Sequence, residues 1–174
     1  MKARAPRSLK GRALQWLAQR EHSRAEMQRK LLPHARALVA QAAAGAGPDV
    51  IDAPEPGDVM ARVTEVLDWL EAHNYLSQQR FAESRIHARA ARHGNLRIQQ
   101  ELAQHGIALD AEAAQALKGS EFERAQEVWR RKFTAPASDA AARARQARFL
   151  SQRGFSAETV RRVLRQSGVA GEDD

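Results

Sequence analysis

The chain contains Trp16-Leu-Ala-Gln-Arg-Glu-His-Ser23 near its beginning and Phe149-Leu-Ser-Gln-Arg-Gly-Phe-Ser156 near its end. Each stretch is typical of the last turns of one helix, a short turn, and a serine that begins the next helix. The common register continues beyond the two stretches, because Arg29 corresponds to Arg162. The two ends of the chain therefore resemble copies of one small helical unit. Chains of copied helical units usually present a long surface to a partner and do not enclose a catalytic pocket.

The rest of the sequence also predicts helices, because apolar residues recur at helical spacing and no segment alternates as a strand does. Ser23-Arg-Ala-Glu26 forms a capping box, in which the serine accepts from the backbone of the glutamate and the carboxylate reaches back. Met27 and Leu31 continue as a buried stripe, and we expect Pro33 to end or kink this helix. A weaker middle copy runs from Phe81 to Arg92, breaks at Gly94-Asn95, and continues as a second helix.

Two interruptions divide this pattern into about three units. Residues 41–57 are rich in Gly and Pro and predict an exposed inserted loop, and a second break covers residues 134–138. The predicted division is a first helical repeat over 1–76 with the loop 41–57 inserted, a second repeat over 77–119, a third repeat over 120–168, and an acidic tail over 169–174.

Charge is segregated along the chain, which carries a net charge of +7. Residues 1–36 hold ten Lys or Arg against two acids, and residues 124–166 hold eleven against three. Residues 37–79 hold one against seven. Ordinary solvated helix faces would alternate in sign, whereas clustered cations favour a polyanion or an acidic protein surface as the partner.

Several classes of function lack their sequence signals. The chain has no cysteine, and its six histidines form no His-x-x-x-His or Glu-x-x-His pair, so we predict no metal site. No nucleophile elbow or phosphate loop is present, and we predict no catalytic residues, no cofactor and no small-molecule substrate. No apolar run reaches the roughly 20 residues that span a bilayer, and we predict a cytoplasmic protein that does not bind membranes.

The sharpest cationic feature is Arg85, Arg89 and Arg92, which fall at i, i+4 and i+7 on one face of the predicted middle helix. Like charges at this spacing destabilise an isolated helix, so an acidic partner is expected. That partner is either an external surface or an acid of the chain itself, such as Glu101. The same question applies to two further sets, and the candidate contact residues are Arg85, Arg89, Arg92, Arg143, Arg145, Arg148, Arg161, Arg162 and Arg165.

Three segments resemble signatures of the RecX family, bacterial regulators of the RecA recombinase. The central one is Asn74-Tyr-Leu-Ser-Gln-Gln-Arg-Phe-Ala-Glu-Ser84, followed by Gly94, Ile98-Gln-Gln-Glu-Leu102 and Gly106-Ile107. The C-terminal one is Phe149-Leu-x-x-Arg-Gly-Phe-Ser156, and the N-terminal one is Ser23-x-x-Glu-Met-x-x-Lys-Leu31. Each is only moderately specific, but the three in order cover nearly the whole chain. The sequence departs from the family at Ser77-Gln-Gln79, where acidic residues are usual, and in its longer loop 41–57.

The resemblance implies an all-α fold of three tandem three-helix repeats in an elongated, curved right-handed array. It further implies a protein without enzymatic activity that binds within the groove of the RecA filament on single-stranded DNA, depresses ATP hydrolysis and strand exchange, and favours filament disassembly or capping. Binding to free DNA is expected to be weak and salt-dependent. The residues alone leave a second class open, a direct DNA-binding protein of helix-turn-helix type, because short helices joined by tight turns with basic second helices also describe that motif.

Overall fold

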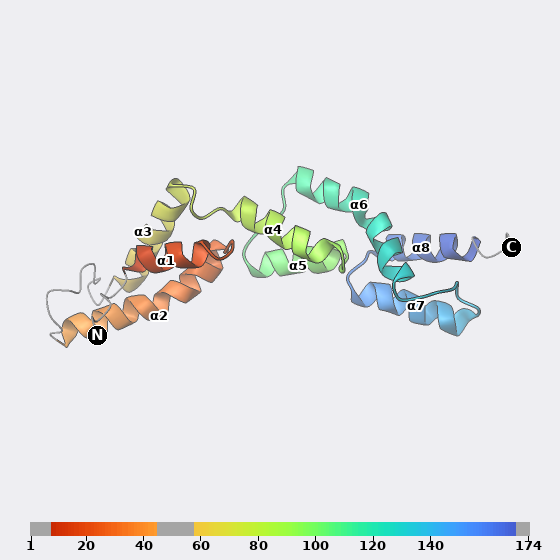
Figure 1. Cartoon of the computed structure of the whole chain (residues 1–174), viewed down its shortest axis with the longest axis horizontal. Helices are drawn as coiled ribbons and strands as arrows, with labels where there is room; N and C mark the ends of the chain where they lie inside the picture. The colour runs from red at the N-terminus through yellow and green to blue at the C-terminus, as the bar shows by residue number, and fades with distance from the viewer. Residues whose placement is uncertain (1–7, 45–57, 170–174) are drawn as a thin grey trace. The chain divides into compact units, whose positions relative to one another are not determined.

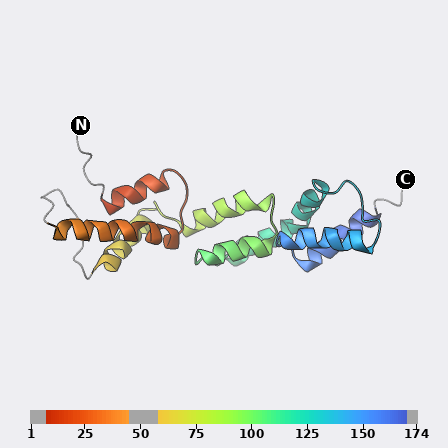
Figure 2. The same cartoon turned by 90° about the horizontal axis from the view of Figure 1, so that it is seen from below.

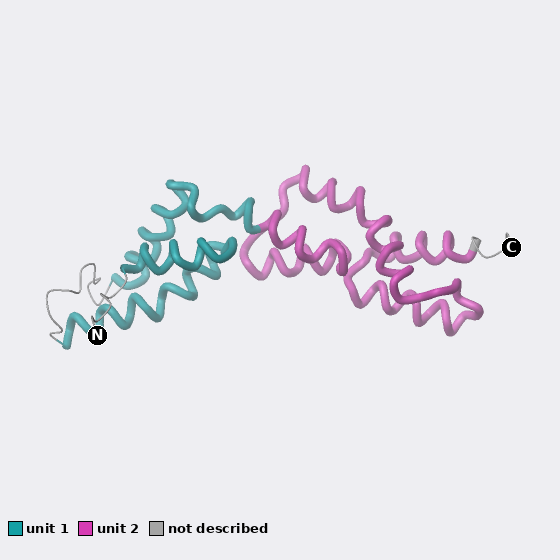
Figure 3. The backbone as a smooth tube through the Cα atoms, in the orientation of Figure 1, with its two compact units in different colours: residues 1–81 teal, residues 82–174 magenta. Residues whose placement is uncertain are grey.

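The computed structural model describes residues 8–44 and 58–169, and within these ranges the chain forms helices and no strands (Figure 1). The inserted loop 41–57 lies outside the described residues except at its start, where the helix continues to Ala43 instead of ending at Gln41. The tail 169–174 lies outside them except for the backbone of Val169. The chain divides into two compact units, residues 1–81 and 82–174 (Figure 3). The division into three repeats at 76/77 and 119/120 stays a prediction.

The first unit is built from α1 (Leu9–Leu17), α2 (Arg24–Ala43), α3 (Val59–Ala72) and the first turn of α4 (Gln78–Ala90). The long α2 contacts both α1 and α3, and α1 lies beside it in both views (Figures 1 and 2). These helices share one apolar core, because each buries one stripe of its surface. The core residues are Leu9, Ala13, Met27, Leu31, Ala35, Leu38, Val63, Val66, Leu67, Leu70 and Leu76.

Short polar side chains define where the helices of the first unit begin. Ser23 Oγ accepts from the backbone N–H of Glu26 at 3.1 Å, which confirms the predicted cap, and Ser8 Oγ accepts in the same way from Gly11. Each such cap contributes about 1 kcal/mol. Of the two predictions for Pro33, the one that it ends the helix is wrong, because α2 continues ten residues beyond it. Burial of Leu31, Ala35 and Leu38 on both sides of Pro33 offsets the loss of the backbone hydrogen bond that proline cannot donate.

The second unit contains the rest of α4, followed by α5 (Asn95–Gln104), α6 (Ala111–Arg130), α7 (Ala140–Gln152) and α8 (Ala157–Val169). Helices α6, α7 and α8 contact one another, and α5 contacts α6. Asp110 and Asp139 cap α6 and α7 by accepting from backbone N–H groups at 2.7 Å. An apolar cluster of this unit consists of Ala125, Val128, Trp129, Leu150, Phe155, Val160, Val163 and Leu164.

Candidate functional site

Two tight turns of the second unit meet backbone to backbone. The turn between α4 and α5 donates from Gly94 N to Arg153 O at 2.8 Å, and Leu96 N donates to Gly154 O at 3.0 Å. A Cβ atom on Gly94 would lie 2.2 Å from Phe155 N, so only glycine allows this approach. Gly154 has a φ of +80°, a region that glycine enters without steric cost. The two glycines therefore fix the α4–α5 turn against the α7–α8 turn.

A buried carboxylate from a third helix holds the same two turns. Glu121 of α6 is 4% exposed and accepts from Asn95 N at 2.9 Å and from Ser156 N at 3.3 Å, at the beginnings of α5 and α8. The hydroxyls of Ser156 and Thr159 donate to its other oxygen at 2.7 and 2.8 Å. Burial alone would raise the pKa of Glu121, but the hydrogen bonds from Ser156, Asn95 and Thr159 outweigh it and lower the pKa below its ordinary value.

Arg124, one turn after Glu121, completes this support. Its guanidinium donates to the carbonyls of His93 at 2.8 Å and Leu117 at 3.1 Å, and to the side-chain oxygen of Asn95. These acceptors lie at the end of the α4–α5 connection and within α6, so one side chain ties the turn to the helix. A guanidinium with five donors suits this position because its fork reaches several acceptors at once.

A groove of about 690 Å³ opens beside the paired turns. Its walls come from the α4–α5 turn, the end of α6, and the end of α7 with the turn that follows it. Its lining carries five cationic side chains, and no acidic residue is among the described residues that line it. The five are Arg92, Arg97, Arg131, Lys132 and Arg153. Because like charges repel, so dense a set generates a potential that a bound anion would offset.

One arginine of the groove packs on an aromatic ring. The guanidinium carbon of Arg153 lies 3.8 Å from the centre of the Phe149 ring, and its Nη1 donates to Phe149 O at 3.4 Å. Phe149 is itself fixed by an edge-to-face contact with Phe133, with ring centres 5.1 Å apart. The guanidinium of Arg153 is therefore positioned over this ring before any ligand arrives.

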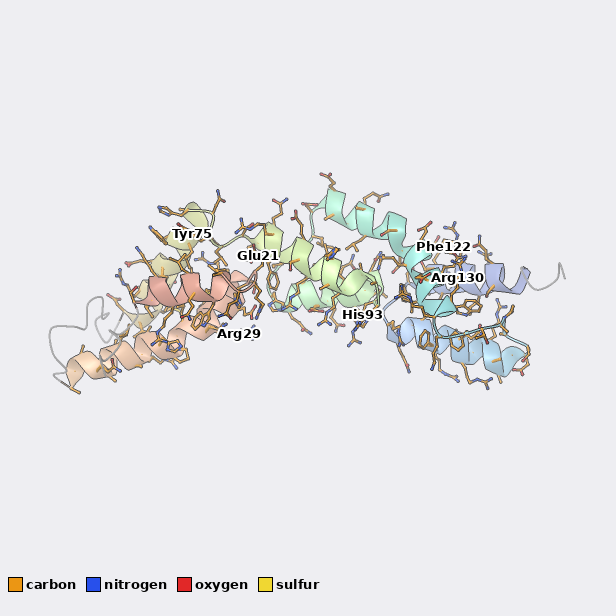
Figure 4. The ribbon with its side chains drawn as sticks, viewed as in Figure 1. Glu21, Arg29, Tyr75, His93, Phe122 and Arg130 are labelled. Carbon is orange, nitrogen blue, oxygen red and sulfur yellow. The ribbon has the colours of Figure 1, made fainter. Side chains whose placement is uncertain are left out.

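His93 also lines the groove and lies where the α4–α5 connection turns (Figure 4). Its Nδ1 atom is buried and has no hydrogen-bond partner among the described residues. Burial lowers the pKa of His93 below its ordinary value, and Arg97, Arg89 and Arg153 lower it further against the opposing effect of Glu101. Both effects favour the neutral imidazole in the chain alone, whereas a bound anion would favour its protonation.

The structure separates the predicted stripe of three arginines. Arg89 donates to both oxygens of Glu101 on α5, at 2.9 and 3.3 Å, and Arg85 lies 3.5 Å from the same carboxylate. The helix ends at Ala90, earlier than the expected Arg92, so Arg92 lies in the turn and lines the groove. Arg85 and Arg89 thus have the partner within the chain that was one of the two alternatives. Their contact with an external partner stays a prediction.

The other predicted arginines lie on the exposed faces of α7 and α8. Arg162 covers the ring of Phe122, with its guanidinium carbon 3.8 Å from the ring centre. No carboxylate lies within ion-pair distance of the remaining five among the described residues, and these five are Arg143, Arg145, Arg148, Arg161 and Arg165. Sequence reasoning missed Arg97, Arg131, Lys132 and Arg153, which belong to three different segments. One available signal was the turn glycine Gly154, which directly follows Arg153.

The comparisons with known proteins agree with this architecture. Residues 77–117 match the second three-helix domain of RecX, and residues 120–164 match its third three-helix domain. Over 98% of its length the chain is 47% identical to the regulatory protein RecX of Herbaspirillum seropedicae, of which it covers 97%. The chain belongs to the RecX family. A RecX relative from Leptothrix cholodnii is 48% identical over 91% of the chain and 88% of its own length.

The crystal structure of RecX from Lactobacillus salivarius matches the fold with a TM-score of 0.66 at 19% identity, over 92% of this chain and 95% of that one. The predicted all-α fold of RecX three-helix domains is thus confirmed. RecX proteins are regulatory and not enzymatic, which confirms the prediction that the chain is not an enzyme. None of the helices in the described ranges is long and apolar enough to cross a membrane.

Proposed function

We propose that this chain is a non-catalytic modulator, mainly an inhibitor, of the RecA recombinase. It binds in the groove of the RecA filament on single-stranded DNA and depresses ATP hydrolysis and strand exchange. Membership in the RecX family supports the regulatory role. The observation that carries the proposal is the acid-free groove of the second unit, in which five cations converge. Such a groove suits a nucleoprotein filament, because the filament offers phosphates along its length.

The exposed arginines of α7 and α8 supply a second cationic surface that supports this proposal. Arg143 and Arg148 lie on α7 and Arg161 and Arg165 on α8, all exposed and without a carboxylate partner in the described part of the chain. Charge-assisted contacts from such side chains contribute about 1.5–3 kcal/mol each when they meet an anionic group. Several of them together give affinity for a filament without any enclosed pocket.

The test is a titration of DNA-dependent ATP hydrolysis by RecA with single-stranded DNA in excess. We expect inhibition at concentrations of the chain well below that of RecA, because one bound molecule blocks growth of the filament or destabilises neighbouring subunits. Unchanged hydrolysis would exclude the RecA proposal. A need for equimolar or greater amounts would favour the alternative, a direct DNA-binding protein of helix-turn-helix type that competes for DNA. The two helix pairs joined by tight turns, α4–α5 and α7–α8, are what favour that alternative.

A variant of the predicted arginine stripe distinguishes contact with the filament from pairing with Glu101. Arg85, Arg89 and Arg92 changed together to alanine keep helix-forming residues at the two α4 positions and alter only an exposed side chain in the turn, so the fold should be kept. We expect the inhibitory concentration to rise by an order of magnitude or more if these side chains contact the filament. Full inhibition by the folded triple variant would show that the pairing of Arg85 and Arg89 with Glu101 is their whole role.

A further inference from the structure

We propose that the groove beside the two paired turns binds a nucleotide unit, with its phosphates on the arginines and its base stacked on the guanidinium of Arg153. This inference deepens the proposed function and rests on it, since it names the part of the filament, the DNA strand, that this groove would hold. Its ligand chemistry is a phosphate group joined to a planar ring. A strand of single-stranded DNA supplies that chemistry, and so does a free nucleotide.

The first argument is the size and charge of the groove. A volume of about 690 Å³ lies within the range of roughly 300–1,000 Å³ that is usual for ligand sites. Arg92 and Arg97 lie on one wall and Arg131 and Lys132 on another, and all four side chains are exposed. Among them only Arg131 has a carboxylate nearby in the described residues, with Glu127 at 2.9 Å on the same helix. The remaining cations are therefore available to phosphate oxygens.

The second argument separates a nucleotide from an acidic peptide. Phe149 covers one face of the Arg153 guanidinium at 3.8 Å, so a planar ring that enters the groove has the opposite face on which to stack. Nucleobases stack on guanidinium planes in this way, and aspartate and glutamate side chains do not. A carboxylate of an acidic peptide would instead pair with the edge of the guanidinium, in its plane. The open face of Arg153 is thus a feature that a base uses and a carboxylate does not.

The third argument is the position of His93. Its buried Nδ1 has no hydrogen-bond partner among the described residues, and the charges of Arg97, Arg89 and Arg153 act on it, with Glu101 as the opposing charge. A phosphate in the groove would reduce the repulsion that these arginines exert on a protonated imidazole. Binding should therefore raise the pKa of His93, which provides a local signal of where the ligand lies.

The experiment compares two matched oligonucleotides without RecA present. One is a labelled 15-residue oligothymidylate and the other is an abasic strand with the same phosphates, both at physiological ionic strength. The key variant is Arg153→Lys, which keeps the charge but loses the flat guanidinium, and the control is Arg36→Lys on the exposed side of α2 in the first unit. Circular dichroism and thermal unfolding establish that each variant is folded.

If the base stacks on Arg153, Arg153→Lys should weaken binding of oligothymidylate about 5-fold or more and leave the abasic strand unchanged, since one stacked base contributes about 1–3 kcal/mol. Arg36→Lys should affect neither strand. The imidazole signal of His93 should move to a higher pKa on binding. The stacking inference would be overturned if Arg153→Lys weakened binding of both strands equally, or weakened binding of neither. It would also be overturned if polyglutamate of equal charge competed as effectively as oligothymidylate.

Thymidine triphosphate distinguishes the two sources of the ligand. If thymidine triphosphate competes at the same concentration as the oligonucleotide, with both counted in nucleotides, the groove is a site for free nucleotides. Competition only at much higher concentrations would identify the DNA strand. The ATP hydrolysis titration is independent of this result. A chain that inhibits RecA yet fails the stacking test would disprove the groove inference and leave the proposed function standing.

Discussion

Removal of the Glu121 carboxylate should strongly destabilise the second unit. In Glu121→Ala, the N–H groups of Asn95 and Ser156 lose their acceptor, and the hydroxyls of Ser156 and Thr159 lose theirs. A buried donor left without a partner costs about 1–3 kcal/mol. The hydroxyls can rotate toward other acceptors, but the two backbone groups cannot. We therefore expect a loss of about 3–5 kcal/mol, similar to breaking a buried charged network.

Glu121→Gln provides the graded comparison, because it keeps the volume and one acceptor oxygen but turns an N–H₂ group toward donors. Its expected loss is about 1–3 kcal/mol. Glu123→Ala, on the exposed side of the same helix, should change stability by less than about 0.5 kcal/mol. Urea unfolding followed by circular dichroism gives the free energies of unfolding. Hydrogen exchange should lose protection first at the amides of Asn95 and Ser156. A loss below about 1 kcal/mol for Glu121→Ala, or unchanged protection of these amides, would refute the reasoning.

Three further outcomes are expected. Gly94→Ala should cost at least about 3 kcal/mol because its Cβ would lie 2.2 Å from Phe155 N, whereas Gly119→Ala, with nothing within 4 Å, should gain about 0.5–1 kcal/mol in the interior of α6; equal urea midpoints for the two would contradict this. Ser23→Ala should cost about 1 kcal/mol and Ser138→Ala much less, since Asp139 and not Ser138 caps α7; equal losses in thermal unfolding would argue against the cap. Arg20 and His22 outweigh the effect of burial and lower the pKa of Glu26 from 4.5 to about 2, so its stabilisation is complete above pH 4.5 and is lost as the pH falls toward 2. Glu26→Gln should flatten the dependence of the urea midpoint on pH in that window, and an unchanged slope would contradict the assignment.

The helices and their caps could be predicted because the interactions that determine them are local. Ser23 and the amide of Glu26 are three residues apart, so the sequence between them contains the whole motif. The prediction that Pro33 ends the helix was wrong for a physical reason. The penalty for a proline inside a helix is local and visible in the sequence, whereas the burial of Leu31 and Leu38 that outweighs it comes from packing against other helices.

The groove could not be predicted because its residues are adjacent only in the folded chain. Arg97, Arg131 and Arg153 lie in three different elements and share no spacing. Glu121 was equally hidden, since a single acid within a helical stretch resembles any solvated residue, and its four donors lie 26 to 38 positions away. The stripe of Arg85 and Arg89 was visible in the sequence, but the position of Glu101 relative to it was not.

The continuity of α6 affects how proteins of this architecture can change over evolution. One family domain ends at residue 117 and the next begins at residue 120, yet the helix runs from Ala111 to Arg130 without a break. The last helix of one domain is thus the first helix of the next, and Glu121 on it supports turns on both sides. A deletion or duplication at this border would divide a helix and separate the carboxylate from the Asn95 amide, one of its four donors. We therefore expect these two domains to be inherited, shortened or recombined only as a pair.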